Sequence, residues 1–467
     1  MDKGSLFTKT SEIFRKVQGT LEGLGEDGLP LGEMEVTLSD IKSLSKSDVK
    51  TSADVFTYIG LKQMETFVNR LIRDRFAPLT SIILYFVYQE LMELIHEPKG
   101  IREILTHLIY LLDRYKVDPN WCLYEQTLVL IDAINEVSSH LPQNKQLREL
   151  ISTVNSWKNS TPCVLPSKLS TNEILSTLKI EDTNNFERLL FLLWRLLEKA
   201  REKSKSKLHS ITPQIFTDPD TFLQYIELLI KYIHDFCVQE LKLPLVDIPI
   251  QLRVVYGEES KFTDAIAYFY RQGDNRFVVI HLPTGEKEIY LSEYAHLIIH
   301  EGIPGHATCD YLLSLLSTIK PLDYATSLDI TAPFSFVDCA SIFHEGWAVI
   351  SQYIVSKHLR ESFPALWYSW FNELHLYVTR VLQVLGYLKR TPREIIRSIR
   401  PYQLVSYFLG FLAYKTIYDI DPKGLLKSVM GGVFPVLPNL FGSHQFERKF
   451  LSSLNELIKE VNDFLRE

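Results

Sequence analysis

Apolar residues recur at three- and four-residue intervals along most of the chain, a spacing that predicts a mainly helical protein. The pattern stops at 157–171, where two prolines and several serines and threonines predict a loop. It breaks again near the polar run 182–185. The segments that carry the helical pattern in this part of the chain are 52–77, 79–96, 99–115, 121–140, 143–156, 172–207 and 219–241.

The pattern changes in the middle of the chain. Residues 250–255 and 276–282 are rich in β-branched side chains and are bounded by turn-forming residues, so they predict two strands. The helical pattern then returns and continues to the end, apart from a glycine- and proline-rich interruption at 431–443. We therefore expect a mostly α-helical fold with a small β-sheet directly before a helix that begins near Ser292.

A chain of 467 residues has the mass of two or three domains and can bury a sizeable core. We divide it into an N-terminal helical region at 1–160, a helical continuation at 161–243, and a region at 244–467 that carries the candidate chemistry.

Charge, cysteine content and the apolar runs bear on the partners and the location of the protein. The net charge is −7, which disfavours nucleic acid because phosphate binding needs a concentrated basic face. The basic run 199–207 is typical of a solvated helix end. Five scattered cysteines without a Cys-x-x-Cys pair favour a reducing, cytoplasmic setting. We expect no signal peptide and no membrane-spanning helix, because the N-terminus lacks an apolar core and no run of 18 residues is uninterruptedly apolar.

The first candidate site residues are two histidines and the glutamate between them. We expect Ser292 to cap a helix that has His300 and Glu301 well inside it, and His306 follows six residues after His300. In the common zinc motif His-Glu-x-x-His, a four-residue spacing puts both histidines on one helix face. An offset of six residues rotates the second histidine by about 240°, so a regular helix cannot direct both to one ion. Pro304 and Gly305 offer a remedy, because they permit a local bulge in the helix that swings His306 back toward His300.

A second predicted helix, at 338–358, carries Glu345. Two histidines with a carboxylate from a neighbouring helix form a common catalytic zinc site, which leaves one coordination position open. We therefore expect His300, His306 and Glu345 to bind Zn²⁺. Glu301 would then be the general base that takes a proton from water and passes it to the leaving group.

Three elements of the chain resemble a known family. Residues 300–306 (HEGIPGH), 345–348 (EGWA) and 401–410 (PYQLVSYFLG) follow one another in the order found in the prokaryotic family called domain of unknown function eight-eight-five. That family carries His-Glu-Ala-x-Pro-Gly-His, Glu-Gly-Trp-Ala-x-Tyr and Pro-Gly-Gln-x-x-x-Tyr-x-x-Gly, and its members are regarded as zinc hydrolases. The resemblance, which lies within 276–442, implies a zincin-like helical body and peptidase activity; we expect a deep cleft with the small sheet at its rim.

The chain also departs from the family pattern. Many relatives have a second histidine where this chain has Ala307, and an acidic residue where it has Gln352. The family's Asp-x-Gly-x-His element corresponds to residues 384–388, which read VLGYL. These differences leave open a change of substrate or a loss of activity.

Several other residues are weaker candidates. His296 shares a helix face with His300, but we favour a core role for it, and His344 should point away from Glu345. Cys309 and Cys339 are typical small buried residues. We also expect Trp347 to pack beneath Glu345.

Tyrosines and arginines near the C-terminal end complete the candidates. Tyr407 and Tyr414 share a predicted helix face, and Tyr407 could stabilise an oxyanion, although a core role is about equally consistent with the pattern. Arg397 and Arg400 could hold a substrate carboxylate, but a surface role is favoured for both.

The function that we expect is hydrolysis of peptide bonds by a zinc-dependent peptidase, either a carboxypeptidase or an oligopeptidase. A peptide substrate could pair with the edge of the predicted sheet. Two alternatives remain open: a catalytically inactive helical scaffold that binds peptides, and a zinc hydrolase of non-peptide amides. The sequence does not set the oligomeric state.

Overall fold

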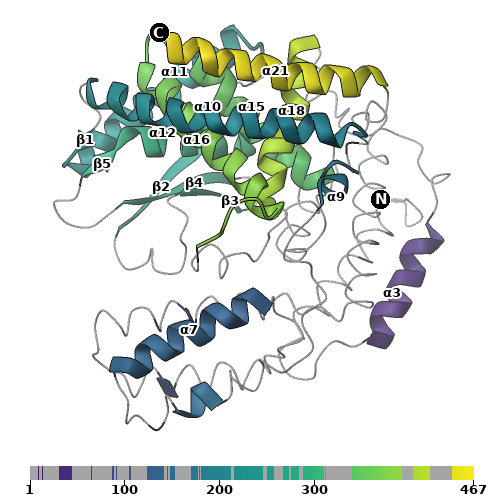
Figure 1. Ribbon diagram of the computed structural model, residues 1–467. Coiled ribbons are helices and arrows are strands. Elements are labelled where there is room, and N and C mark those ends of the chain that lie inside the picture. The colour runs from purple at the N-terminus through teal and green to yellow at the C-terminus, as the bar shows by residue number, and fades with distance from the viewer. Residues whose placement is uncertain are drawn as a thin grey trace. The chain divides into compact units, whose positions relative to one another are not determined.

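The computed structural model divides the chain into two compact units (Figure 1). The first comprises Met1–Ser170, Asp323–Phe336 and Gln383–Tyr402, and the second comprises Thr171–Leu322, Val337–Leu382 and Gln403–Glu467. The boundary that we placed between 243 and 244 falls inside the second unit. Apart from short runs and single positions between them, the structure describes residues 31–44, 124–140, 170–176, 180–211, 215–243, 251–256, 267–272, 275–282, 288–309, 339–391, 403–420 and 444–467.

The described helices of the first unit are α3 (Leu31–Ser43) and α7 (Tyr124–His140). One face of α7 is apolar and buried, as the periodicity predicts, with Leu130 and Ile134 at its centre. The helices predicted between 52 and 115 lie almost entirely outside the described residues.

The second unit is mostly helical, and it carries the candidate site. Two of its helices, α10 and α21, run side by side in Figure 1 and are tied by the Lys203 ammonium, which donates to the Leu465 carbonyl at 3.2 Å. The helices of this unit are α9 (Thr171–Ser176), α10 (Thr183–His209), α11 (Pro219–Gln239), α12 (Leu291–Glu301), α15 (Cys339–His358), α16 (Pro364–Val384, whose end crosses into the first unit), α18 (Gln403–Ile420) and α21 (His444–Arg466).

Helices α15 and α18 pack closely because both carry glycine at their contact. A Cβ atom added to Gly346 would lie 2.5 Å from the carbonyl carbon of Gly410 and 2.6 Å from its Cα. Side chains would therefore hold the two backbones apart. Around this contact the core is aromatic, with the rings of Tyr353, Trp370 and Phe411 within 5.3–5.7 Å of one another.

The sheet confirms both predicted strands and adds a third. Strands β2 (Gln251–Tyr256) and β4 (Asn275–Leu282) pair in parallel, and β3 (Ala267–Gln272) pairs with β4 in antiparallel fashion, in the order β2-β4-β3. The sequence did not reveal β3, which is an edge strand and ends in polar residues. Two further strands of two residues each, β1 (Ile215–Phe216) and β5 (Ile289–Tyr290), pair with each other. Strand β5 lies directly before α12 in the chain.

The mostly helical fold with a small sheet is thus as predicted, whereas the zincin-like arrangement and the deep cleft stay predictions. None of the helices in the described part of the chain combines the length and the apolar character that crossing a bilayer requires.

The contact between Gly346 and Gly410 gives a test of the core. We expect Gly346→Ala to lower the free energy of unfolding by about 1–3 kcal/mol, because its methyl group would force two packed backbones apart. Thermal unfolding followed by circular dichroism measures this change. The control is Ser452→Ala on the exposed face of α21, and an equal melting temperature for both variants would contradict the close packing.

Candidate metal centre

Helix α12 brings the first two site residues to its C-terminal end. It begins after Tyr290, which occupies the N-cap position without a side-chain hydrogen bond, and it ends at Glu301. The prediction that Ser292 caps the helix was therefore wrong. So was the expectation that His300 and Glu301 lie well inside it, because they are its last two residues.

The chain turns immediately after Glu301, and it does so within a tightly packed segment. The Gly305 N–H donates to the carbonyl of Ile299 at 3.0 Å, across six residues, which is longer than any regular helical step. A Cβ on Gly305 would lie 1.8 Å from the His300 carbonyl oxygen, so only glycine fits. Helical structure resumes at His306. The predicted distortion is confirmed, but it takes the form of a stop and a restart rather than a bulge.

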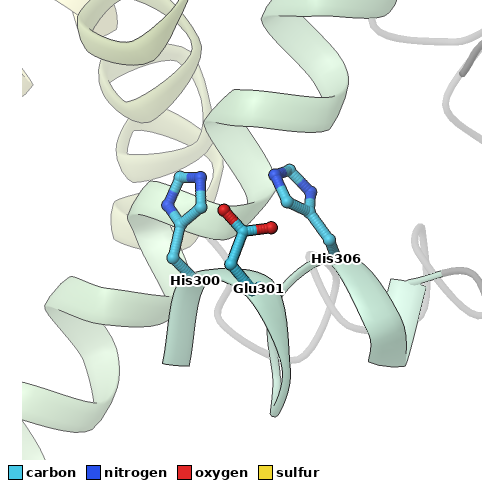
Figure 2. A group of neighbouring side chains, drawn as sticks. All are labelled: His300, Glu301 and His306. Carbon is cyan, nitrogen blue, oxygen red and sulfur yellow. The ribbon is translucent and has the colours of Figure 1, made fainter. Parts of the chain in front are cut away.

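The turn returns His306 to the side of His300. Figure 2 shows both imidazoles and the Glu301 carboxylate pointing to the same side, with the carboxylate between the rings. The two ring centroids are 4.7 Å apart. His300, Glu301 and His306 bring one possible ligand atom each to within 4.8 Å of one another, so this cluster could hold a metal ion.

Helix α15 adds a second carboxylate, that of Glu345. Its Oε2 atom lies 3.2 Å from His300 Nε2 and 3.4 Å from His306 Nε2. All three side chains are buried, since each residue is only 4–5% exposed. The Trp347 indole, two residues further along α15, donates to the Pro304 carbonyl at 2.7 Å and so ties α15 to the turn that carries His306.

The charge of the buried Glu345 carboxylate is balanced by the two histidines that face it. Burial alone would lower the pKa of His300, but its hydrogen bond to Glu345 and the charges of Glu301 and Glu345 outweigh burial and raise it. Burial likewise favours a neutral Glu345, yet hydrogen bonds from His300 and His306 hold the pKa of its carboxyl well below the usual value. The carboxylate thus stays charged in a buried position, which demands a proton or a metal ion on the facing nitrogens.

The donor set fits a tetrahedral zinc ion. Ligand atoms at about 2.0–2.1 Å from one such ion lie about 3.3–3.4 Å from each other. The separations of 3.2 and 3.4 Å between Glu345 Oε2 and the two Nε2 atoms match this spacing. Two imidazoles and one carboxylate are also the ligand types that zinc accepts in catalytic sites.

Both carboxylates lie close to the histidines, and their surroundings differ. Glu345 Oε2 touches both Nε2 atoms directly and is buried. Glu301 is partly exposed, and its Oε2 accepts a hydrogen bond of 3.0 Å from the backbone N–H of Phe269 on β3. The contacts therefore favour Glu345 as the third ligand and leave Glu301 beside the cluster, in the position of a base.

Gln352 on α15 fixes the proton of His300. Its Nε2 donates to the backbone carbonyl of His296 at 3.2 Å, and a carbonyl can only accept, so the orientation of the amide is determined. Its Oε1 then faces Tyr377 Oη at 3.1 Å and His300 Nδ1 at 3.2 Å. Because Oε1 cannot donate, Nδ1 of His300 carries a hydrogen, which leaves Nε2 to bind a metal ion or, when it is protonated, to donate to Glu345.

Two stacked tyrosines close one side of the cluster. The Tyr407 ring on α18 lies 5.7 Å from the His300 ring and 5.4 Å from the Tyr377 ring, nearly parallel to both. Burial raises the pKa of each tyrosine well above its usual value, so both hydroxyls stay protonated at neutral pH. Arg380 lies over the Tyr407 ring at 5.9 Å. Sequence reasoning missed Tyr377 and Arg380, which occupy an ordinary amphipathic helix.

The other described residues that the sequence singled out are buried in the core. His296 is buried with its Nε2 bonded to the Leu366 carbonyl at 3.0 Å, and burial lowers its pKa to about 4, which suits a neutral core residue. Tyr414 is buried with its ring 6.1 Å from that of Trp347, and Cys309 is a buried free thiol. The side chains of His344 and Cys339, together with Arg397 and Arg400, lie outside the described residues.

Comparison with known proteins shows similarity of fold. The chain matches no family model, and no curated protein matches it. Two solved structures, both described as putative lipoproteins, are similar to it at 13% identity. One, from Colwellia psychrerythraea, has a TM-score of 0.52 and covers 98% of this chain and 100% of its own. The other, of unknown function and from Shewanella oneidensis, has a TM-score of 0.55 with coverage of 94% and 99%.

The ligand set predicts metal content. The purified protein should hold about one zinc ion per chain, and His300→Ala, His306→Ala and Glu345→Ala should each lose most of it. Elemental analysis of dialysed protein measures the content. His375→Ala is the matched control, because this buried histidine pairs with Glu198 away from the cluster. Full zinc retention by Glu345→Ala, with loss in Glu301→Ala, would make Glu301 the third ligand instead.

The role of Gln352 predicts opposite effects of two substitutions. Gln352→Leu should weaken zinc affinity about 10- to 100-fold, because the partner that orients His300 is lost. Gln352→Glu should strengthen zinc affinity, since a carboxylate makes the imidazole more basic. It should also lower the melting temperature of the metal-free protein, because a carboxylate cannot donate to the His296 carbonyl. Chelator competition measures affinity, and Ser356→Ala on the same helix is the control. Unchanged affinity in both variants would contradict this role.

Proposed function

We propose that this protein is a zinc-dependent hydrolase that cleaves peptide bonds. The observation that carries the proposal is the convergence of His300 Nε2, His306 Nε2 and Glu345 Oε2 at separations of 3.2 and 3.4 Å in a buried position. A bound zinc ion supplies Lewis acidity, which polarises a carbonyl group and makes water easier to deprotonate. The residues around it supply the proton transfer, the oxyanion contact and the binding of the substrate.

Glu301 is the general base in this proposal. It follows a ligand directly in sequence, lies within 4.8 Å of both histidines and is partly exposed, so water can reach it. The Phe269 N–H holds its Oε2 atom and thereby limits the carboxylate to one orientation. A carboxylate held in this way accepts a proton from water and returns it to the leaving nitrogen.

Tyr407 supplies a hydrogen-bond donor for the oxyanion. Its ring stacks on His300, and its hydroxyl responds to the charges of Glu345 and Glu301, which, after burial, help to raise its pKa. A hydroxyl that remains protonated beside two carboxylates can donate to the negative charge that develops on a carbonyl oxygen.

The edge of the sheet supports a peptide as the substrate. Strand β3 lies at the edge of the sheet, and among the described residues no strand pairs with its outer side. The Phe269 N–H reaches Glu301, so this outer side faces the candidate base. An extended peptide that added to β3 would run past Glu301, with backbone groups of alternate β3 residues available to it.

Replacing the base separates an enzyme from an inactive scaffold. Glu301→Gln preserves size and removes the base, so we expect folding and zinc to be retained while peptide hydrolysis falls by about two to four orders of magnitude. Zinc content, melting temperature and turnover of a peptide library are measured on the same preparations. Glu361→Gln, on the exposed turn after α15, is the control.

The possible outcomes distinguish the functions. Wild-type protein that holds zinc yet cleaves no peptide or amide supports the peptide-binding scaffold. Cleavage of non-peptide amides, without cleavage of peptides, supports a zinc hydrolase that acts on non-peptide amides. Equal turnover by wild type and Glu301→Gln would contradict the role of Glu301 and leave the zinc site intact.

A further inference from the structure

Arg380 is a cation placed one aromatic ring away from the candidate metal centre. It lies on α16, one turn after Tyr377, and its guanidinium carbon is 5.9 Å from the centre of the Tyr407 ring. The same ring is 5.7 Å from the ring of His300. Tyr407 also stacks on Tyr377 at 5.4 Å, so the ring that the guanidinium contacts is itself packed against two other rings.

The guanidinium has no acidic partner among the residues that the structure describes. Its recorded contact is with the face of the Tyr407 ring, and the side chain is only partly exposed. The protein has an excess of acidic residues, 57 against 50 basic ones, so a partly buried arginine without a carboxylate is unexpected. Among the described residues no acceptor takes its N–H donors, and these five donors form a planar fork that can bind an anion.

The position of Arg380 determines what anion can be bound. Its charge acts on the hydroxyls of both Tyr407 and Tyr377, the same groups that respond to Glu345. Glu301 repels a substrate carboxylate from its side of the cluster, whereas Arg380, on the far side of the Tyr407 ring contact, attracts one. A planar carboxylate matches the fork of a guanidinium, which can bind both of its oxygens.

We propose that Arg380 binds the C-terminal carboxylate of the substrate, so that the protein is an exopeptidase that acts from the carboxyl end of peptides. This inference rests on the proposed peptidase function and adds the class of substrate. The guanidinium carbon lies 5.9 Å and the His300 ring 5.7 Å from the centre of the Tyr407 ring, so the two are at most about 12 Å apart. One to three extended residues, at about 3.4 Å each, cover a span of this size. The product released would therefore be a single amino acid or a short C-terminal peptide.

Pairs of peptides that differ only at the C-terminus test the proposal. N-acetylated pentapeptides with a free carboxylate and with a carboxamide are incubated with the zinc-loaded full-length protein, and products are identified by mass spectrometry. We expect release of C-terminal residues from the acids, with kcat/KM about 10- to 1,000-fold lower for the amides.

Substitutions of Arg380 show whether it causes this preference. Arg380→Gln should lower the ratio of kcat/KM for acids to that for amides to about 1, whereas Arg380→Lys should restore part of the preference. Arg360→Gln, on the exposed turn before α16, is the control and should behave as wild type. Equal cleavage of acids and amides by wild type, or an undiminished preference in Arg380→Gln, would overturn the proposal.

Binding separates this inference from the proposed function. The same peptide pairs are titrated calorimetrically into zinc-loaded Glu301→Gln protein, in which hydrolysis is suppressed, with and without Arg380→Gln. Tighter binding of the acid that depends on Arg380 supports the carboxylate site, even if wild type proves unable to hydrolyse peptides. Equal binding of acid and amide, or no binding of either, overturns the carboxylate site, even if hydrolysis at internal bonds is observed.

Discussion

A buried carboxylate that faces two imidazole nitrogens is the constraint on which the described part of the second unit depends. Glu345 Oε2 lies within 3.4 Å of both His300 Nε2 and His306 Nε2, and no arrangement of lone pairs alone satisfies that geometry. Either hydrogens on the imidazole nitrogens or a metal ion must lie between these atoms. Three features keep these atoms in place: the turn that returns His306, the Gln352 amide oxygen that accepts a hydrogen bond from Nδ1 of His300, and the aromatic stack around Tyr407.

The backbone, more than the side chains, sets the position of this carboxylate. Glu345 precedes Gly346, and the missing side chain of Gly346 lets α15 touch α18 at Gly410. Trp347 then links α15 to the turn through the Pro304 carbonyl. The short segment that contains these residues thus connects three elements, and the ligand lies at their junction. The same reasoning explains why glycine is required at 305, where any side chain would enter the His300 carbonyl.

The sequence revealed the elements with strong periodicity and the residues with distinctive chemistry. It predicted α10, α11 and α15 and the two more apolar strands, and it placed His300, Glu301, His306 and Glu345 together, as the structure does. It missed β3, whose edge position weakens the apolar signal, and misplaced the ends of α12. From the sequence, Gln352 was interpreted only as the replacement of an acidic residue. Its three hydrogen-bond partners, on other parts of the fold, cannot be inferred from the local sequence. Tyr377 and Arg380 gain their meaning only from helix packing, which the local pattern does not contain.

The candidate ligands come from chain segments on either side of the stretch between 311 and 339. A bound ion would therefore also stabilise the fold. An ion held by His300, His306 and Glu345 joins the end of α12 to α15, and an unfolded chain cannot assemble that arrangement. By mass action, the folded state then gains free energy with each rise in free metal concentration above the dissociation constant. The fraction of the chain that is folded would then follow the metal supply, so that metal shortage would lower the amount of folded protein.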